Sequence, residues 1–137
     1  MGLTVVDAGV LIGFLDRKDA HHPAAVAALA DLVDSGERLM APASVLAEVL
    51  VGPARRGLDA VAAVLQFVER LPIEIAPLDK DTALAAATIR AAHRSVKLPD
   101  ALVLATASVI GADTLVTTDR GWPTGRRLGL RLSIHVI

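Results

Sequence analysis

The stretch LTVVDAG at residues 3–9 decides the fold that this sequence predicts. Its first four residues form a short apolar, β-branched run, which is typical of a strand buried on both faces near the centre of a sheet. The run stops at Asp7, and a turn is expected over residues 7–9. Because ligands of open α/β sheets bind outside the carboxyl ends of such strands, Asp7 is a prime candidate for a functional residue.

The rest of the chain alternates between strand and helix patterns. Further strands are predicted at residues 38–41, 73–75, 114–118 and 132–136, and helices at residues 23–35, 42–51, 58–68, 80–93 and 99–111. Gly52-Pro53 is expected to end the helix that begins at Pro42. Strands that alternate with helices form a mostly parallel sheet. We therefore predict one α/β domain over residues 1–137, a sheet of about five strands sandwiched by helices, with strands 73–75 and 132–136 at its edges.

Composition narrows the classes of protein to which the chain can belong. The 137 residues are 53% hydrophobic and include no cysteine, which excludes disulfides, thiol catalysis and cysteine-zinc sites. Any metal is therefore expected to be a hard cation on oxygen ligands. No apolar run reaches the roughly 20 residues that a membrane-spanning helix needs. Asp7 interrupts the N-terminus before a signal peptide forms, so we expect a cytoplasmic protein with no membrane partner.

The charge of the chain is unevenly distributed. Residues 1–119 carry ten basic and fifteen acidic residues, whereas residues 120–137 carry four arginines and no acid. Such an asymmetry is typical of proteins with a basic interaction segment. Arg126 and Arg127 are therefore candidates for contacts with substrate phosphates, the alternative being that they are solvated surface residues.

Four acidic residues stand where a carboxylate needs an explanation. Asp7 and Asp119 each follow a predicted strand, while Glu48 and Asp100 lie near the starts of helices that follow strands. Taken singly, helix capping or turn chemistry explains three of them. Glu48 lies in a helix that is apolar on nearly all sides, where an unpaired charge costs several kcal/mol. In a parallel sheet all four positions converge on one edge.

Converging carboxylates imply a cation. Four acids crowded together repel one another, and a metal ion among them relieves that repulsion. An oxygen cage of this kind suits Mg²⁺ or Mn²⁺, which keep several waters and accept phosphate oxygens. The chemistry that then becomes available is metal-assisted hydrolysis of phosphodiester bonds.

Four sequence blocks in this order carry a family resemblance. They are VVD at residues 5–7, SVLAE at residues 44–48, LPDA at residues 98–101 and LVTTD at residues 115–119. Through them the whole chain resembles PIN-domain ribonucleases, specifically VapC-type toxins of bacterial toxin–antitoxin pairs. The resemblance implies that Asp7, Glu48, Asp100 and Asp119 are the catalytic, metal-binding acids. Ser44 and Thr117 would be supporting hydroxyls, and Gly121 stands where the family commonly has a further acid.

The resemblance also implies partners. It suggests a homodimer, an RNA substrate, and an antitoxin whose chain covers the acidic site. The helix over residues 80–93 is rich in alanine, so a second helix can approach it closely, and we predict a dimer that uses this region, with Ala86 and Ala87 as probes. The alternative function is a non-catalytic PIN-like module that binds RNA or protein.

Overall fold

The computed structural model describes residues 2–137 and contains a five-stranded sheet in the order β3-β2-β1-β4-β5. The strands are β1 (Leu3–Val6), β2 (Arg38–Pro42), β3 (Ile73–Ala76), β4 (Thr114–Thr117) and β5 (Ser133–Val136). All four neighbouring pairs run parallel. The predicted α/β class is confirmed, with β1 at the centre and the two alternating strands at the edges. Val5 and Val6 of β1 are fully buried, as a central strand requires.

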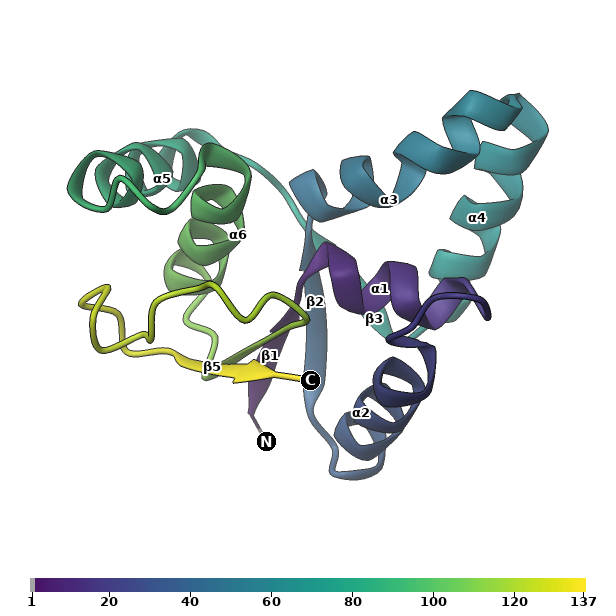
Figure 1. Ribbon diagram of the computed structural model, residues 1–137, viewed down its shortest axis with the longest axis horizontal. Helices are drawn as coiled ribbons and strands as arrows, with labels where there is room; N and C mark the ends of the chain where they lie inside the picture. The colour runs from purple at the N-terminus through teal and green to yellow at the C-terminus, as the bar shows by residue number, and fades with distance from the viewer. Residues whose placement is uncertain (1) are drawn as a thin grey trace.

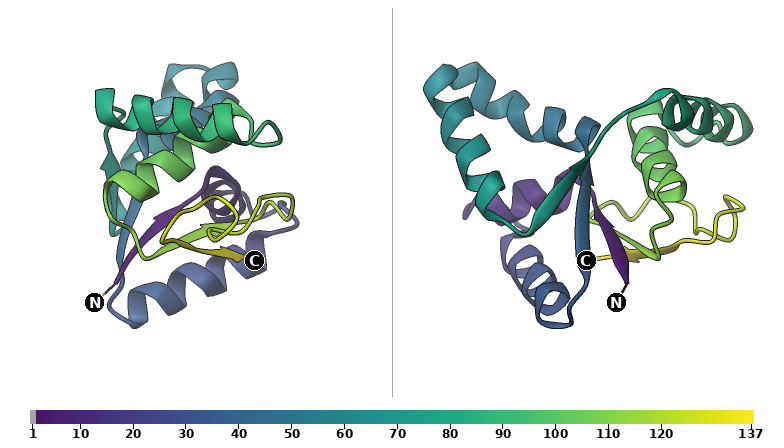
Figure 2. Two further views of the ribbon diagram at one scale, coloured as in Figure 1. Left: turned by 90° about the vertical axis from the view of Figure 1, so that its left-hand side faces the viewer. Right: turned by 180° about the vertical axis from the view of Figure 1, so that it is seen from behind.

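Six helices surround this sheet (Figure 1). They are α1 (Ala8–Leu15), α2 (His22–Asp34), α3 (Ala43–Arg56), α4 (Leu58–Arg70), α5 (Lys80–Ala92) and α6 (Leu98–Val109). Helices α1 and α2 cover one face, and α5 and α6 lie on the other (Figure 2). Helices α3 and α4 pack together as a hairpin that extends beyond the sheet. Among the described residues, no helix is long and apolar enough to cross a membrane.

The structure contains helix α1 at a position where the sequence predicts only a turn. Asp7 caps this helix, because its Oδ1 accepts the Ala8 backbone N–H at 2.8 Å. The segment AGVLIGFL has no polar face, so the periodicity of an amphipathic helix is absent from it. The helix packs against α2, α3 and β4. Gly9 allows close packing there, since a Cβ at this position would overlap the Thr118 hydroxyl.

The predicted end of α3 at Gly52-Pro53 is wrong. The helix continues to Arg56 and ends at Gly57, whose φ of 120° is in the region that favours glycine. Pro53 is buried on the same side of the helix as Val45 and Val49. Packing of this face therefore outweighs the backbone hydrogen bond that a proline cannot donate.

The structure of helix α5 shows that Ala86, one of the two residues suggested as probes of the dimer, is unsuitable. Asp79 caps the helix as its position indicates, accepting the Thr82 backbone N–H at 2.9 Å. Ala86 is fully buried in the core, whereas Ala87 is exposed. The many small residues let α5 pack closely on α6 within the same chain. A substitution at Ala86 would therefore disturb the core, and only Ala87 remains a probe of a surface contact.

Candidate active site

The four predicted acids lie at the carboxyl edge of the sheet. Asp7 follows β1 and Asp119 follows β4 by two residues, while Glu48 belongs to the second turn of α3 and Asp100 to the first turn of α6. Asp7 is close enough to Asp119 for their like charges to raise its pKa. The charge of Asp7 in turn raises the pKa values of Glu48 and Asp100. The structure thus brings all four together around Asp7.

Thr117 links two of these acids. Its fully buried hydroxyl donates to Asp7 Oδ2 at 2.7 Å and accepts the Asp119 backbone N–H at 3.0 Å. Asp7 therefore receives one hydrogen bond on each carboxylate oxygen, from Ala8 and from Thr117. These bonds fix the carboxylate plane and leave further lone pairs free for a cation.

Burial dominates the electrostatics of the cluster. It is the largest cause of the raised pKa of Asp7, ahead of the Asp119 charge, and the hydrogen bonds from Thr117 and Ala8 oppose it. The pKa values of Glu48 and Asp100 are also raised, first by burial and then by neighbouring acids. Three carboxyl groups at one edge thus hold protons more strongly than isolated groups do, which is a common property of functional sites.

Glu48 differs from the expectation of a buried charge. Its residue is exposed, as is its neighbour Ala47. The expectation of a fully buried charge at Glu48 is therefore wrong. Partial burial of the carboxyl is still the largest cause of its raised pKa, followed by the charges of Asp7 and Asp100.

The donor set fits a hard divalent cation. All four acids offer carboxylate oxygens, the ligands that Mg²⁺ and Mn²⁺ prefer. Ser44, one turn before Glu48 on α3, has a buried hydroxyl with no hydrogen-bond partner among residues 2–137. In the same part of the chain, no three acidic or histidine side chains already surround a common point as a ligand set. The four acids therefore share one edge of the sheet without forming a complete ligand set among residues 2–137.

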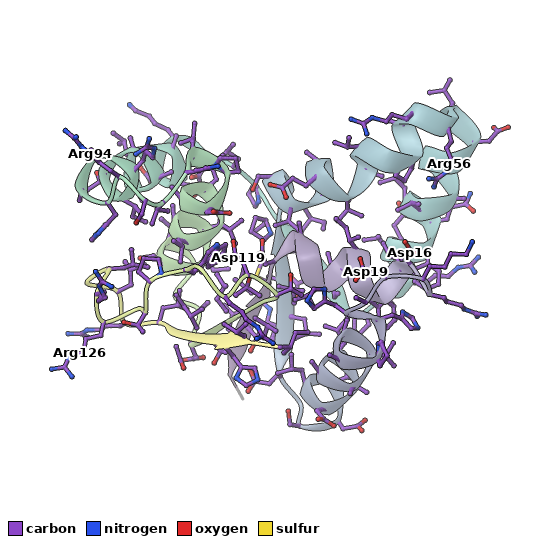
Figure 3. The ribbon with its side chains drawn as sticks, in the orientation of Figure 1. Asp16, Asp19, Arg56, Arg94, Asp119 and Arg126 are labelled. Atoms are coloured by element: carbon purple, nitrogen blue, oxygen red, sulfur yellow. The ribbon has the colours of Figure 1, made fainter. Side chains whose placement is uncertain are left out.

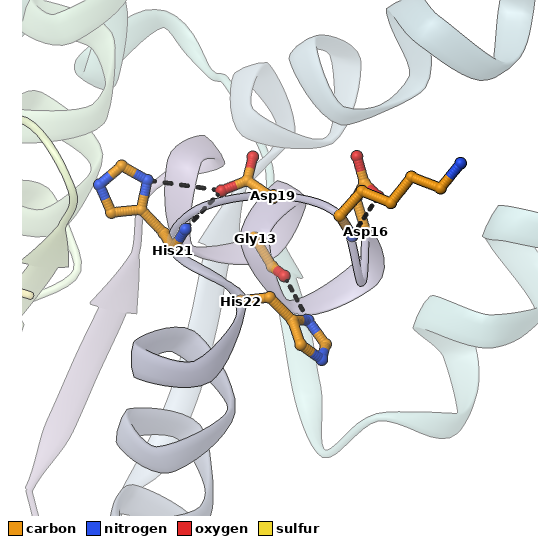
Figure 4. Close-up of polar contacts among 6 residues, drawn as sticks. Gly13, Asp16, Asp19, His21 and His22 are labelled. Atoms are coloured by element: carbon orange, nitrogen blue, oxygen red, sulfur yellow. Dashed lines mark hydrogen bonds and ion pairs between the residues drawn. The ribbon is translucent and has the colours of Figure 1, made fainter.

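The adjacent histidines at the start of α2, His21 and His22, make only local contacts among the described residues (Figure 4). His22 Nδ1 lies 2.7 Å from the Gly13 carbonyl oxygen, and His21 pairs with Asp19 at 3.4 Å. The two adjacent rings point in different directions, as neighbouring residues must. Both contacts are therefore confined to residues 13–22.

The structure does not bring Arg126 to the acids. Its side chain lies at the outer end of the loop between β4 and β5 and points away from Asp119 (Figure 3). Arg127 is exposed in the same loop. A contact of these arginines with RNA therefore stays a prediction, and it would involve phosphates distant from the reacting one.

Two residues near Asp100 were missed by the sequence analysis. Trp122 and Lys97 both lower the pKa of Asp100, against the effects of burial and the neighbouring acids. They line, together with Asp100 and Asp119, a cavity of about 250 Å³. A signal was present in the sequence, since Trp122 is the single tryptophan and lies three residues after Asp119.

Comparison with known proteins decides the family. The sequence model of the PIN domain matches residues 4–126. The chain belongs to the PIN-domain family. A search of curated protein sequences gives no significant match.

Solved structures share the fold of this PIN domain at low sequence identity. VapBC2 from Rickettsia felis, bound to a promoter DNA fragment, gives a TM-score of 0.73 at 16% identity, covering 96% of this chain and 98% of that one. FitAcB from Neisseria gonorrhoeae gives 0.71 at 20% identity, with 96% of both chains covered. VapC20 from Mycobacterium tuberculosis, described as a toxin that cleaves the sarcin-ricin loop, gives 0.65 at 22% identity, covering 82% and 86%.

Proposed function

We propose that this PIN domain is a metal-dependent endoribonuclease, the VapC-type toxin of a toxin–antitoxin pair acting in the cytoplasm. The observation that carries the proposal is the location of Asp7, Glu48, Asp100 and Asp119 at one edge of the sheet, near enough for neighbouring acids to raise the pKa values of the first three. Structural likeness to VapC20, a toxin that cleaves the sarcin-ricin loop, supports RNA as the substrate class.

Each residue has a role that follows from its contacts. The four acids hold Mg²⁺ or Mn²⁺, which when bound activates a water and neutralises charge on the phosphate. Thr117 orients Asp7 through its hydroxyl and restrains Asp119 through its backbone N–H. Ser44 contributes a buried hydroxyl that is free to bond a water or a substrate oxygen. The half-buried setting of Asp7 strengthens its attraction to a cation relative to a fully solvated carboxylate.

Metal-dependent cleavage is the direct test. We expect the purified protein to cut a structured RNA in Mg²⁺ or Mn²⁺ and to stop when a chelator is added. Mn²⁺ is expected to raise the melting temperature, because a ligand that binds only the folded state stabilises it. Cleavage that persists in chelator would contradict the proposal. Mn²⁺ binding without cleavage of any RNA would favour the alternative, a PIN-like module that binds RNA or protein.

The arginines of the C-terminal loop give a second prediction. If Arg126 and Arg127 each contact an RNA phosphate, the double alanine variant should flatten the log–log salt dependence of RNA binding by about two units at most. The control is Arg70→Ala at the end of α4, an exposed arginine that precedes β3 and so lies toward the opposite edge of the sheet. An unchanged slope in the loop variant would identify its arginines as solvated surface residues.

An antitoxin partner is supported by two adjoining hollows, one of which reaches the acids. The first, of about 410 Å³, includes Glu48 in its lining, and the second, of about 570 Å³, includes Phe14 and Phe67. The two adjoin at Leu15 and Val64, which line both. Several structural relatives are toxin–antitoxin complexes. We propose that an antitoxin segment lies along these hollows and covers the acidic site.

The predicted dimer is tested at α5. Ala87 and Leu84 are both exposed on this helix, and Leu84 shows 60% of its surface. We expect sedimentation at micromolar concentration to give a dimer, and Ala87→Arg to give a monomer because a charged side chain prevents close helix approach. Ala62→Arg on the exposed side of α4 is the control. A monomeric wild-type protein would contradict the prediction.

A further inference from the structure

The indole nitrogen of Trp122 is buried and has no hydrogen-bond partner among residues 2–137. Its ring packs against the hydrophobic core, and its indole Nε1 is inaccessible to solvent and makes no hydrogen bond of standard geometry with any residue from 2 to 137. Leaving a buried donor unpaired costs about 1–3 kcal/mol, so such a group in a folded protein calls for an explanation.

Trp122 and Asp100 border the same cavity. Both residues line the cavity of about 250 Å³ that also contains Lys97 and Asp119. Trp122 and Lys97 both oppose the rise in the pKa of Asp100, which burial and then the charges of Asp7 and Asp119 cause. Asp100 thus lies between two acids, Asp7 and Asp119, and two residues that favour its charged form, Trp122 and Lys97.

The loop that follows β4 contributes an N–H donor near the acids. Gly121 donates its backbone N–H to Asp119 Oδ1 at 2.8 Å. PIN-domain ribonucleases, which this chain resembles, commonly have a further acid at the position of Gly121. The next residue, Trp122, lines the same cavity as Asp100 and carries an unpaired N–H. Two consecutive residues of this loop therefore lie beside two of the four metal-binding candidates.

We propose that Trp122 is a positioning residue whose indole N–H holds one oxygen of Asp100, so that the other oxygen turns toward the cation shared with Asp7. The proposal rests on the function proposed above. Carboxylates that bind metals are commonly held by hydrogen bonds from outer groups, and charged acceptors make such bonds stronger than neutral ones. The unpaired N–H of Trp122, in the cavity that Asp100 also lines, is available for such a bond.

The first test measures Mn²⁺ affinity by calorimetry. Trp122→Phe keeps an aromatic ring and removes the donor, and we expect it to weaken Mn²⁺ binding about tenfold, the lower end of the range for outer-shell partners. Leu128→Ala, a buried residue of the same loop, is the matched control for loosening of the loop alone. We expect Leu128→Ala to lower the melting temperature and to change Mn²⁺ affinity less than twofold.

A spectroscopic test needs no variant of Trp122. Because the chain has one tryptophan, its ¹⁵N–¹H spectrum contains a single indole resonance. Titration with Mg²⁺ should move this resonance downfield with the same affinity as calorimetry with Mg²⁺ gives, since its hydrogen bond shortens. In Asp100→Asn the shift should be largely lost.

The outcomes separate the two proposals. If wild type binds Mn²⁺ and Trp122→Phe binds it equally well, or Leu128→Ala loses as much affinity, the positioning role is overturned while the proposed function stands. An indole resonance unmoved at saturating Mg²⁺ overturns it too, even if Trp122→Phe fails to fold. A wild-type protein that binds neither ion overturns both.

Discussion

Replacing Asp100 with asparagine is expected to abolish RNA cleavage while making the metal-free protein more stable at neutral pH. Asparagine keeps the shape of the side chain and removes its charge. The loss of one of four carboxylate ligands should reduce cleavage by more than the roughly 100-fold that losing an outer-shell partner costs. The gain in stability follows from relief of the partial burial of the Asp100 charge and of its repulsion by Asp7 and Asp119, which together raise its pKa.

The pH dependence has a definite sign. The folded-state pKa values of Asp7, Glu48 and Asp100 are all raised, so the folded protein binds more protons than the unfolded chain between the unfolded value near 4 and the raised values. Stability from these groups is therefore present below that window and is lost as pH rises through it. Asp100→Asn removes one such group and should recover a few tenths of a kcal/mol to about 1 kcal/mol at pH 7.

Thermal melts with and without Mn²⁺ measure both consequences. The variant should melt higher than wild type in the absence of metal, and Mn²⁺ should stabilise it less, because the loss of a ligand weakens binding to the folded state. The control is Asp113→Asn at the opposite edge of the sheet, where Asp113 accepts the Leu3 N–H at 2.8 Å. Lower metal-free stability of Asp100→Asn, together with an unchanged Mn²⁺ shift, would show that the acids do not share a site.

Gly125→Ala should destabilise the protein strongly, because alanine does not fit the C-terminal loop at this position. Gly125 is buried, and a Cβ there would overlap the carbonyl oxygen of Leu132. Its own carbonyl accepts the Leu130 N–H at 2.8 Å, so the loop closes tightly on this residue. Because the clash is with backbone, the chain must shift, at a cost of about 1–3 kcal/mol or more.

The backbone shift that Gly125→Ala causes should extend to the acidic site. Gly125 lies three residues after Trp122 in the loop that leads from Asp119 to β5, so we expect Gly125→Ala to weaken Mn²⁺ binding as well as to lower the midpoint of urea unfolding. Gly52→Ala on α3 is the matched control, since the atom nearest to its Cβ would be 4.0 Å away. Alanine there should stabilise by about 0.5–1 kcal/mol through helix propensity. Equal stability of the two variants would contradict the tight closure of this loop.

The errors of the sequence analysis have physical causes. Helix α1 was missed because its residues are apolar on every side, and the end of α3 was misplaced because burial of Pro53 outweighs the local preference of a proline. Ala86 was taken for a surface residue because a helix rich in alanine has no contrast between its faces. Each case is one in which packing against distant residues overrides a local pattern.

The pattern of residues alone identified the parallel sheet, its central strand and the edge on which the acids gather. These features follow from local rules, because apolar runs buried on both faces form central strands and parallel strands share one carboxyl edge. Tertiary packing decided that Thr117 bridges Asp7 and Asp119, that Glu48 reaches solvent, and that Trp122 stands beside Asp100. Such contacts join residues far apart in the chain or lie in loops without periodicity, so only the folded arrangement of the elements brings them into reach.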